Sequence, residues 1–212
     1  MAVITEPRPS TSSGIIKFID GIGFDGLGSA GFDENDLLII GDELDNILEG
    51  GPGHDEIDGG AGNDTITGGA GNGILNGGDG DDIIDGQEGT ERLFGGNGND
   101  ILLAGGTVPV SFIQPGAGDF DRLNGGAGND TFGFYGVGNF EIADFKIGED
   151  RLFFDSEVLG ITQISELLPH ITNFVDNGDS GFTAEFLGGA AYIELVGVNL
   201  NSITADMIVF SL

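Results

Sequence analysis

Acidic side chains recur with a period of nine residues in the middle of this chain, at seven of nine equivalent positions, and their chemistry favours the binding of cations. Residues 41–103 divide into seven consecutive blocks of nine residues, and two more blocks follow at 116–124 and 125–133. The sixth position of a block carries a carboxylate or amide side chain except where glycine stands: Asn46, Asp55, Asp64, Gly73, Asp82, Glu91, Asp100, Asp121 and Asp130.

The eighth position of every block is apolar. It is occupied by Leu48, Ile57, Ile66, Leu75, Ile84, Leu93, Leu102, Leu123 and Phe132. A disordered tract rich in glycine and aspartate would scatter its apolar residues, so the unbroken series predicts folded repeats. The glycines that open each block permit a tight turn, and the last three residues favour a short strand whose middle side chain points inward.

The whole block reads Gly-Gly-x-Gly-x-Asp-x-U-x, where U is an apolar residue. The clearest copies are 50–58, 59–67, 77–85 and 95–103. This nonapeptide resembles the repeat of RTX proteins, also called haemolysin-type calcium-binding repeats. The resemblance implies an all-β fold, a right-handed parallel β-roll with two short strands per coil. It also implies that several Ca²⁺ ions lie between stacked turns.

In the family, the ligands are sixth-position carboxylates and carbonyl groups of the glycine run, an oxygen-only set that suits Ca²⁺. The resemblance therefore assigns metal ligation to Asp64, Asp82, Asp100, Asp130, Asp55, Asp121, Asn46 and Glu91. It assigns carbonyl ligation to Gly59, Gly60, Gly62, Gly77, Gly78, Gly80, Gly95, Gly96, Gly98, Gly126 and Gly128. The structural alternative for these aspartates is that they form turns without binding a metal.

Alternate blocks stack on the same side of such a roll, so its two sides should differ. One side collects Asn46, Asp64, Asp82 and Asp100, and the other collects Asp55, Gly73 and Glu91. The second side lacks a side chain at Gly73, and Gln87 replaces one of its glycines. We expect the ions to be best ordered between Asp64 and Asp82 and between Asp82 and Asp100.

Composition excludes several classes of protein. The formal net charge is −30 with only 6 Lys plus Arg, which argues against binding to nucleic acid or to anionic membrane surfaces. The chain has no cysteine, which removes disulfides and thiolate chemistry, and no apolar run long enough for a membrane span. Glycine accounts for 42 of the 212 residues, as turn-rich repeats require.

Three regions follow from the change in sequence along the chain. Residues 1–40 form a leader and an N-terminal cap, with a strand expected at 15–19 and with the segment 20–40, which ends in the apolar run 37–40, expected to cover the first coil. Residues 41–133 form the roll, which an excursion loop interrupts at 104–115. Residues 134–212 hold 9 of the 16 phenylalanines and form a β-rich C-terminal cap, with a helix expected over 162–171, capped by Thr162, and a hairpin over 182–196.

Other motifs do not indicate a catalytic site. The run Gly21-Ile-Gly-Phe-Asp-Gly26 resembles a dinucleotide fingerprint but lacks the helix that must follow. There is no EF-hand loop and no His-Glu-x-x-His, and His54 and His170 are the only histidines. An acidic pair such as Asp119 and Asp121 could act on a sugar, but ligation of a metal is the favoured role.

The sequence thus indicates a non-enzymatic, secreted, calcium-binding structural or binding module that folds on meeting extracellular Ca²⁺. The resemblance implies bacterial type I secretion, with an uncleaved signal in the C-terminal region ending Asp206-Met-Ile-Val-Phe-Ser-Leu212. The first alternative is an accessory module of a secreted polysaccharide-active enzyme, or a small enzyme of that kind, such as an alginate epimerase-like protein. The second is a surface-layer or adhesin unit.

The outward seventh positions on the first side form an apolar series. They are Ile47, Thr65, Ile83 and Ile101. A continuous apolar stripe usually marks a contact, so we expect it to be covered by residues 15–40, by the excursion loop or by a second copy of the chain. Self-association is therefore a predicted property, and strand propensity on an exposed sheet is the alternative.

Overall fold

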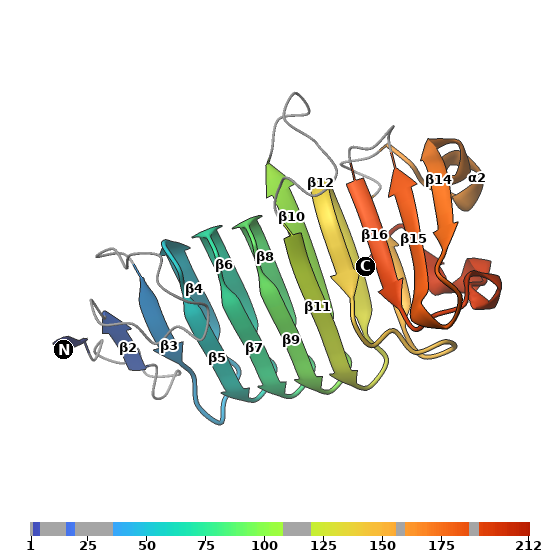
Figure 1. Cartoon of the computed structure of the whole chain (residues 1–212). Helices are drawn as coiled ribbons and strands as arrows, with labels where there is room; N and C mark the ends of the chain where they lie inside the picture. Colours follow the sequence, from blue (N-terminus) through green and yellow to red (C-terminus); the bar gives the residue numbers. More distant parts are fainter. Residues whose placement is uncertain (1, 5–15, 20–35, 108–119, 156–159, 187–190) are drawn as a thin grey trace.

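Short parallel strands dominate the fold, as the nonapeptide spacing predicts. A computed structural model of the chain describes residues 2–4, 16–19, 36–107, 120–155, 160–186 and 191–212. Successive strands of the repeat region alternate between two facing sheets and stack along one axis, which Figure 1 shows as two rows of parallel arrows. The parallel β-roll is therefore confirmed.

The first sheet takes every second strand of the repeats. It contains β4 (Ile47–Pro52), β6 (Thr65–Gly71), β8 (Ile83–Gly89), β10 (Ile101–Thr107), the start of β12 (Thr131–Ile142), β13 (Arg151–Phe154) and β17 (Ile208–Val209). The second sheet contains β3 (Leu37–Ile40), β5 (Glu56–Ala61), β7 (Ile74–Asp79), β9 (Arg92–Asn97), β11 (Phe120–Ala127) and the end of β12.

The register shows that two blocks complete one coil. Thr65 pairs with Ile83 of the next coil, a separation of 18 residues, and the same offset joins β5 to β7 and β7 to β9. Between β10 and β12 the offset grows to 30 residues, because Ile101 pairs with Thr131. The predicted excursion accounts for the extra length: residues 104–107 prolong β10, and residues 108–115 lie outside the described part of the chain.

The core is a column of the eighth-position side chains. From Leu48 to Phe132 each of them is at most 2% exposed. The strands alternate strictly, so neighbouring side chains face outward. Phenylalanines widen the core towards the C-terminal end of the roll. The ring centroid of Phe134 lies 5.0 Å from that of Phe140 and 6.1 Å from that of Phe154.

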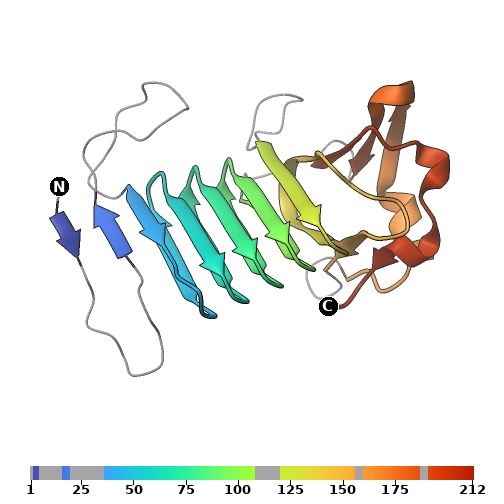
Figure 2. The same cartoon turned by 90° about the horizontal axis from the view of Figure 1, so that it is seen from below.

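Both ends of the roll carry antiparallel strands (Figures 1 and 2). At the N-terminal end β2 (Ile16–Ile19) pairs with β1 (Ala2–Ile4) and with β3. At the C-terminal end the second sheet continues through β16 (Ala191–Val196), β15 (Gly181–Phe186) and β14 (Ile171–Asp176). The predicted strand at 15–19 is confirmed over 16–19, and the predicted hairpin over 182–196 is confirmed, whereas the apolar run 37–40 was not predicted as a strand.

Short helices cross the C-terminal region. They are α2 (Ile164–Leu167) and 3₁₀ turns at Leu168–His170, Gly178–Ser180, Leu200–Ser202 and Ala205–Met207. The predicted N-cap of α2 is wrong, because Gln163 occupies that position. Thr162 instead uses its backbone N–H and its hydroxyl to bond Glu166 at 2.8 and 3.1 Å.

Strand pairing extends past both boundaries predicted for the roll at 41 and 133. Leu38 to Ile40 pair with Glu56 to Asp58 in the parallel register of the repeats. Beyond 133, β12 crosses from the first sheet to the second, and β13 adds another strand to the first sheet. No helix among the described residues is long and apolar enough to cross a membrane.

Candidate calcium-binding site

The sixth-position residues line up along the two sides of the roll. On the side where turns lead into the first sheet, which we call the aspartate side, the series is Asn46, Asp64, Asp82, Asp100, Asp130 and Asp150. On the opposite, interrupted side the series is Leu37, Asp55, Gly73, Glu91, Asp121 and Phe140. The first series is therefore an unbroken column, and the second is not.

A hydrogen-bond ladder holds the aspartate side together. In each layer the backbone N–H of the sixth residue donates to Oδ1 of the sixth residue in the next layer. The donor–acceptor distances are 2.7 Å from Asn46 to Asp64, 2.7 Å from Asp64 to Asp82, 2.9 Å from Asp82 to Asp100, 3.1 Å from Asp100 to Asp130 and 2.9 Å from Asp130 to Asp150. The ladder fixes each carboxylate in one orientation.

The second carboxylate oxygen, Oδ2, remains without a hydrogen-bond donor in four consecutive layers. Oδ2 of Asp64, Asp82, Asp100 and Asp130 is buried and has no hydrogen-bond partner among the described residues. A buried, ionised oxygen without a donor is unfavourable unless a cation or a proton compensates its charge. Four such oxygens in register therefore indicate a column of cation sites.

Backbone carbonyl groups approach the same oxygens. A β-carbon added at Gly59 would lie 2.3 Å from Oδ2 of Asp64 and 2.5 Å from the carbonyl oxygen of Gly77 in the next layer. The first glycine of the block is required because these two oxygens converge over it, leaving no room for a side chain. The same convergence recurs one layer on, over Gly77.

Burial changes the acidity of these carboxyl groups. It raises the pKa of Asp82 to about 6 and that of Asp100 to about 7, while backbone N–H donors oppose the rise and neighbouring aspartates add to it. The pKa values of Asp64 and Asp130 are raised by burial as well. Without a cation, the column therefore attracts protons near neutral pH.

The donor set fits Ca²⁺. Calcium takes six to eight oxygen ligands in a flexible geometry. Among the residues described, no three acidic or histidine side chains gather around one point, so a site must combine carboxylates with glycine carbonyls. The predicted glycines Gly59, Gly60, Gly62, Gly77, Gly78, Gly80, Gly95, Gly96, Gly98, Gly126 and Gly128 all lie in the turns of the aspartate side.

The interrupted side is less regular. Its ladder bonds join Leu37 to Asp55 and Glu91 to Asp121, each at 2.9 Å, but Gly73 offers no side chain between them. Gln87 stands where Gly51 and Gly69 stand in the preceding coils and is held at φ 63°, a left-handed conformation. The predicted site residues Asp55, Glu91 and Asp121 are buried on this side.

The structure adds a layer that sequence reasoning missed. Asp150 is buried and extends the aspartate column, and Leu152 after it enters the core. Residues 145–153 read Phe-Lys-Ile-Gly-Glu-Asp-Arg-Leu-Phe, a tenth block in which Phe145 and Lys146 replace the two leading glycines. The surviving signal in the sequence was Gly148-x-Asp150-x-Leu152.

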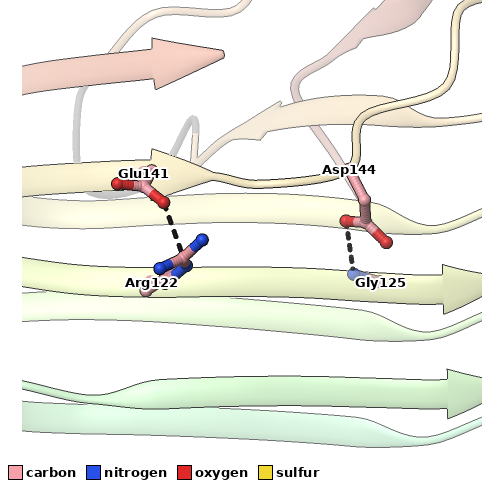
Figure 3. Close-up of polar contacts among 4 residues, drawn as sticks. All are labelled: Arg122, Gly125, Glu141 and Asp144. Carbon is pink, nitrogen blue, oxygen red and sulfur yellow. Dashed lines mark hydrogen bonds and ion pairs between the residues drawn. The ribbon is translucent and has the colours of Figure 1, made fainter. Parts of the chain in front are cut away.

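Polar contacts fasten this last coil to the one before it. Asp144 accepts hydrogen bonds from the backbone N–H groups of Gly125 and Gly126 at 2.9 and 2.8 Å. Arg122 and Glu141 form an ion pair at 2.9 Å on the second sheet (Figure 3). The turn of the tenth block is thereby placed directly over the 126–130 turn.

Comparison with known proteins agrees with this geometry. The family model of the RTX calcium-binding nonapeptide repeat matches four copies, at residues 40–75, 68–102 and 116–132. Residues 40–102 and 116–132 therefore match the RTX repeat, whose family binds calcium. No curated protein matches the chain.

Solved structures resemble the chain at low sequence identity. The AlgE6R3 subunit of the Azotobacter vinelandii mannuronan C5-epimerase is 21% identical over 79% of this chain and 80% of its own, with a TM-score of 0.40. The AlgE6R2 subunit is 21% identical over 81% and 91%, with a TM-score of 0.33. The extracellular lipase LipA from Serratia marcescens is 18% identical, with a TM-score of 0.32, and the match covers 80% of this chain but 39% of the lipase.

Proposed function

We propose that this chain is a secreted, non-catalytic module whose roll folds when it binds several Ca²⁺ ions outside the cell. The observation that carries the proposal is the column of four buried Oδ2 atoms without donors at Asp64, Asp82, Asp100 and Asp130. Bound calcium would compensate this charge, so its binding free energy would become folding free energy.

Calcium should drive a transition from disorder to order. We expect the purified chain to be expanded and poor in β-structure in EDTA, and compact and β-rich in millimolar Ca²⁺. Circular dichroism and the hydrodynamic radius, measured in one calcium titration, test this. Magnesium at the same concentration is the control, because its strict octahedral geometry suits a mixed carbonyl site poorly. A compact, β-rich chain in EDTA at about pH 8, where the carboxylates are ionised, would contradict the proposal.

Export before folding is the second part of the proposal. The formal net charge of −30 favours an extended chain while calcium is scarce, as it is inside cells. The C-terminal segment contributes β17, which pairs with β13 of the roll, so folding would bury part of any signal located there. Co-expression with a type I exporter should therefore release the wild-type chain into the medium, and removing residues 206–212 should reduce that release.

The proposed module has no catalytic role of its own. The acidic groups that recur along the chain form the aspartate column, and their Oδ1 atoms already accept hydrogen bonds from backbone N–H groups. Turnover of mannuronan and other acidic polysaccharides tests this, with product measured by NMR. Calcium-dependent epimerisation or cleavage by the purified chain would favour the alternative, a small polysaccharide-active enzyme.

A further inference from the structure

The two end turns of the aspartate side differ from its inner turns in their second residue. In its inner turns the second residue is glycine with a positive φ, namely 102° at Gly60, 109° at Gly78, 114° at Gly96 and 91° at Gly126. At the two end turns the equivalent residues are Asp42 and Lys146, and neither has a positive φ. A side chain disfavours the left-handed conformation, so the end turns take another path.

In both end turns, a backbone N–H group of the same turn donates a hydrogen bond to the sixth-position side chain. The backbone N–H of Asp42 donates to Oδ1 of Asn46 at 2.9 Å, and the backbone N–H of Lys146 donates to Oδ2 of Asp150 at 2.8 Å. Both oxygens of Asp150 are therefore hydrogen-bonded, since its Oδ1 accepts from Asp130. The four aspartates between these ends keep a buried Oδ2 without a partner.

Lys146 also brings a positive charge to the end of the column. Its ammonium group donates a hydrogen bond to the carbonyl oxygen of Gly126, the second glycine of the preceding layer. Lys146 belongs to the Asp150 layer and its ammonium group contacts the Asp130 layer, so its charge lies between the two layers, as a bound cation would.

We propose that Lys146 is a built-in cation that ends the calcium column. Its ammonium group takes the position between the Asp130 and Asp150 layers, and calcium binds only in the layers before it. This inference rests on the proposed calcium-dependent function. The same residue ends the series of buried oxygens without partners at Asp130, because its backbone N–H donates to Oδ2 of Asp150.

Counting bound ions tests the proposal. Native mass spectrometry at saturating Ca²⁺ should show one more ion on Lys146→Met than on the wild-type chain, because the methionine keeps the length of the side chain and removes its charge. Arg122→Met is the matched control: it removes one positive charge from the same end of the roll, at a side chain 56% exposed on the second sheet. Its ion count should equal that of the wild type.

A second pair of variants keeps the test decisive if Lys146→Met fails to fold. Lys146→Gly restores the glycine of the repeat and should also gain one ion. Asp150→Ala should bind as many ions as the wild type, and loss of one ion would overturn the proposal. Equal, non-zero counts for the wild type and the Lys146 variants would also overturn it. A wild-type count of zero would overturn the proposed function itself.

Discussion

At the scale of single residues, the column on the aspartate side makes each inner aspartate part of two layers. Asp82 accepts a bond from the backbone of Asp64 and donates one to Asp100. We expect Asp82→Ala to raise the calcium midpoint of folding by about tenfold, or ~1.4 kcal/mol. Asp55→Ala removes the same charge from the interrupted side and should raise the midpoint by less. A larger effect of Asp55→Ala in parallel calcium titrations would contradict this.

Gln87 offers a residue-scale prediction of the opposite sign. It is the one non-glycine residue with a positive φ in the described chain, where glycine would adopt the same conformation without strain. In saturating calcium we expect Gln87→Gly to stabilise the roll by about 1 kcal/mol, which corresponds to a rise of about 2–4 °C in Tm. Calorimetry measures it, with Glu88→Gly as a control that should not stabilise.

At the scale of the strand, neighbouring side chains of β8 face opposite sides of the sheet, so one lies in the core and the next on the surface. Ile83 is 43% exposed on the outer face, whereas Ile84 is fully buried in the core column. We expect Ile84→Lys to prevent calcium-induced folding and Ile83→Lys to leave the calcium midpoint within about twofold, since burial of an unpaired charge is the severe change. Circular dichroism titrations of the two variants compare them directly.

The predicted apolar stripe on the first sheet is only partly covered in the single chain. Ile47 is 81% exposed and Ile83 remains exposed, whereas Ile101 is half-buried. Strands β2 and β3 extend the second sheet instead of covering this face. Self-association through the stripe stays a prediction. Light scattering in calcium tests it: a dimer should form and Ile83→Lys should restore the monomer, and a monomeric wild-type chain would exclude this interface.

At the scale of the whole molecule, the raised pKa values make the effect of pH depend on calcium. Burial raises the pKa of Asp82 to about 6 and that of Asp100 to about 7 from 3.8 in the unfolded chain. The folded roll without calcium therefore binds more protons than the unfolded chain between pH 3.8 and 7. Its stability must then rise as the pH falls through this window.

With calcium the sign reverses, because protons compete with the ion for the same carboxylates. We expect the calcium midpoint to increase as the pH falls from 8 to about 5, while β-structure in EDTA increases over the same range. Circular dichroism at a series of pH values, with and without calcium, measures both trends. A calcium midpoint that stays constant or decreases as the pH falls would show that the aspartate column does not bind the ion.

The sequence by itself determined the scaffold. Each coil repeats a local rule, glycine for the turn, aspartate at the sixth position and an apolar residue at the eighth, so the inward column from Leu48 to Phe132 and the two unequal sides could be predicted. The rule is local because each coil contacts only its neighbours in the stack. The period of the sequence is therefore enough to predict a repeat architecture.

Only the tertiary structure decided how the column ends and how each carboxylate divides its oxygens. Phe145 and Lys146 hide the tenth block by replacing its glycines, and its offset from the preceding layer is 20 residues instead of 18. Oδ1 is held by a backbone N–H of another layer, and the ammonium group of Lys146 reaches a carbonyl 20 residues away. These contacts depend on the stacking of coils and not on the residues within a block, which is why the nonapeptide pattern could not reveal them.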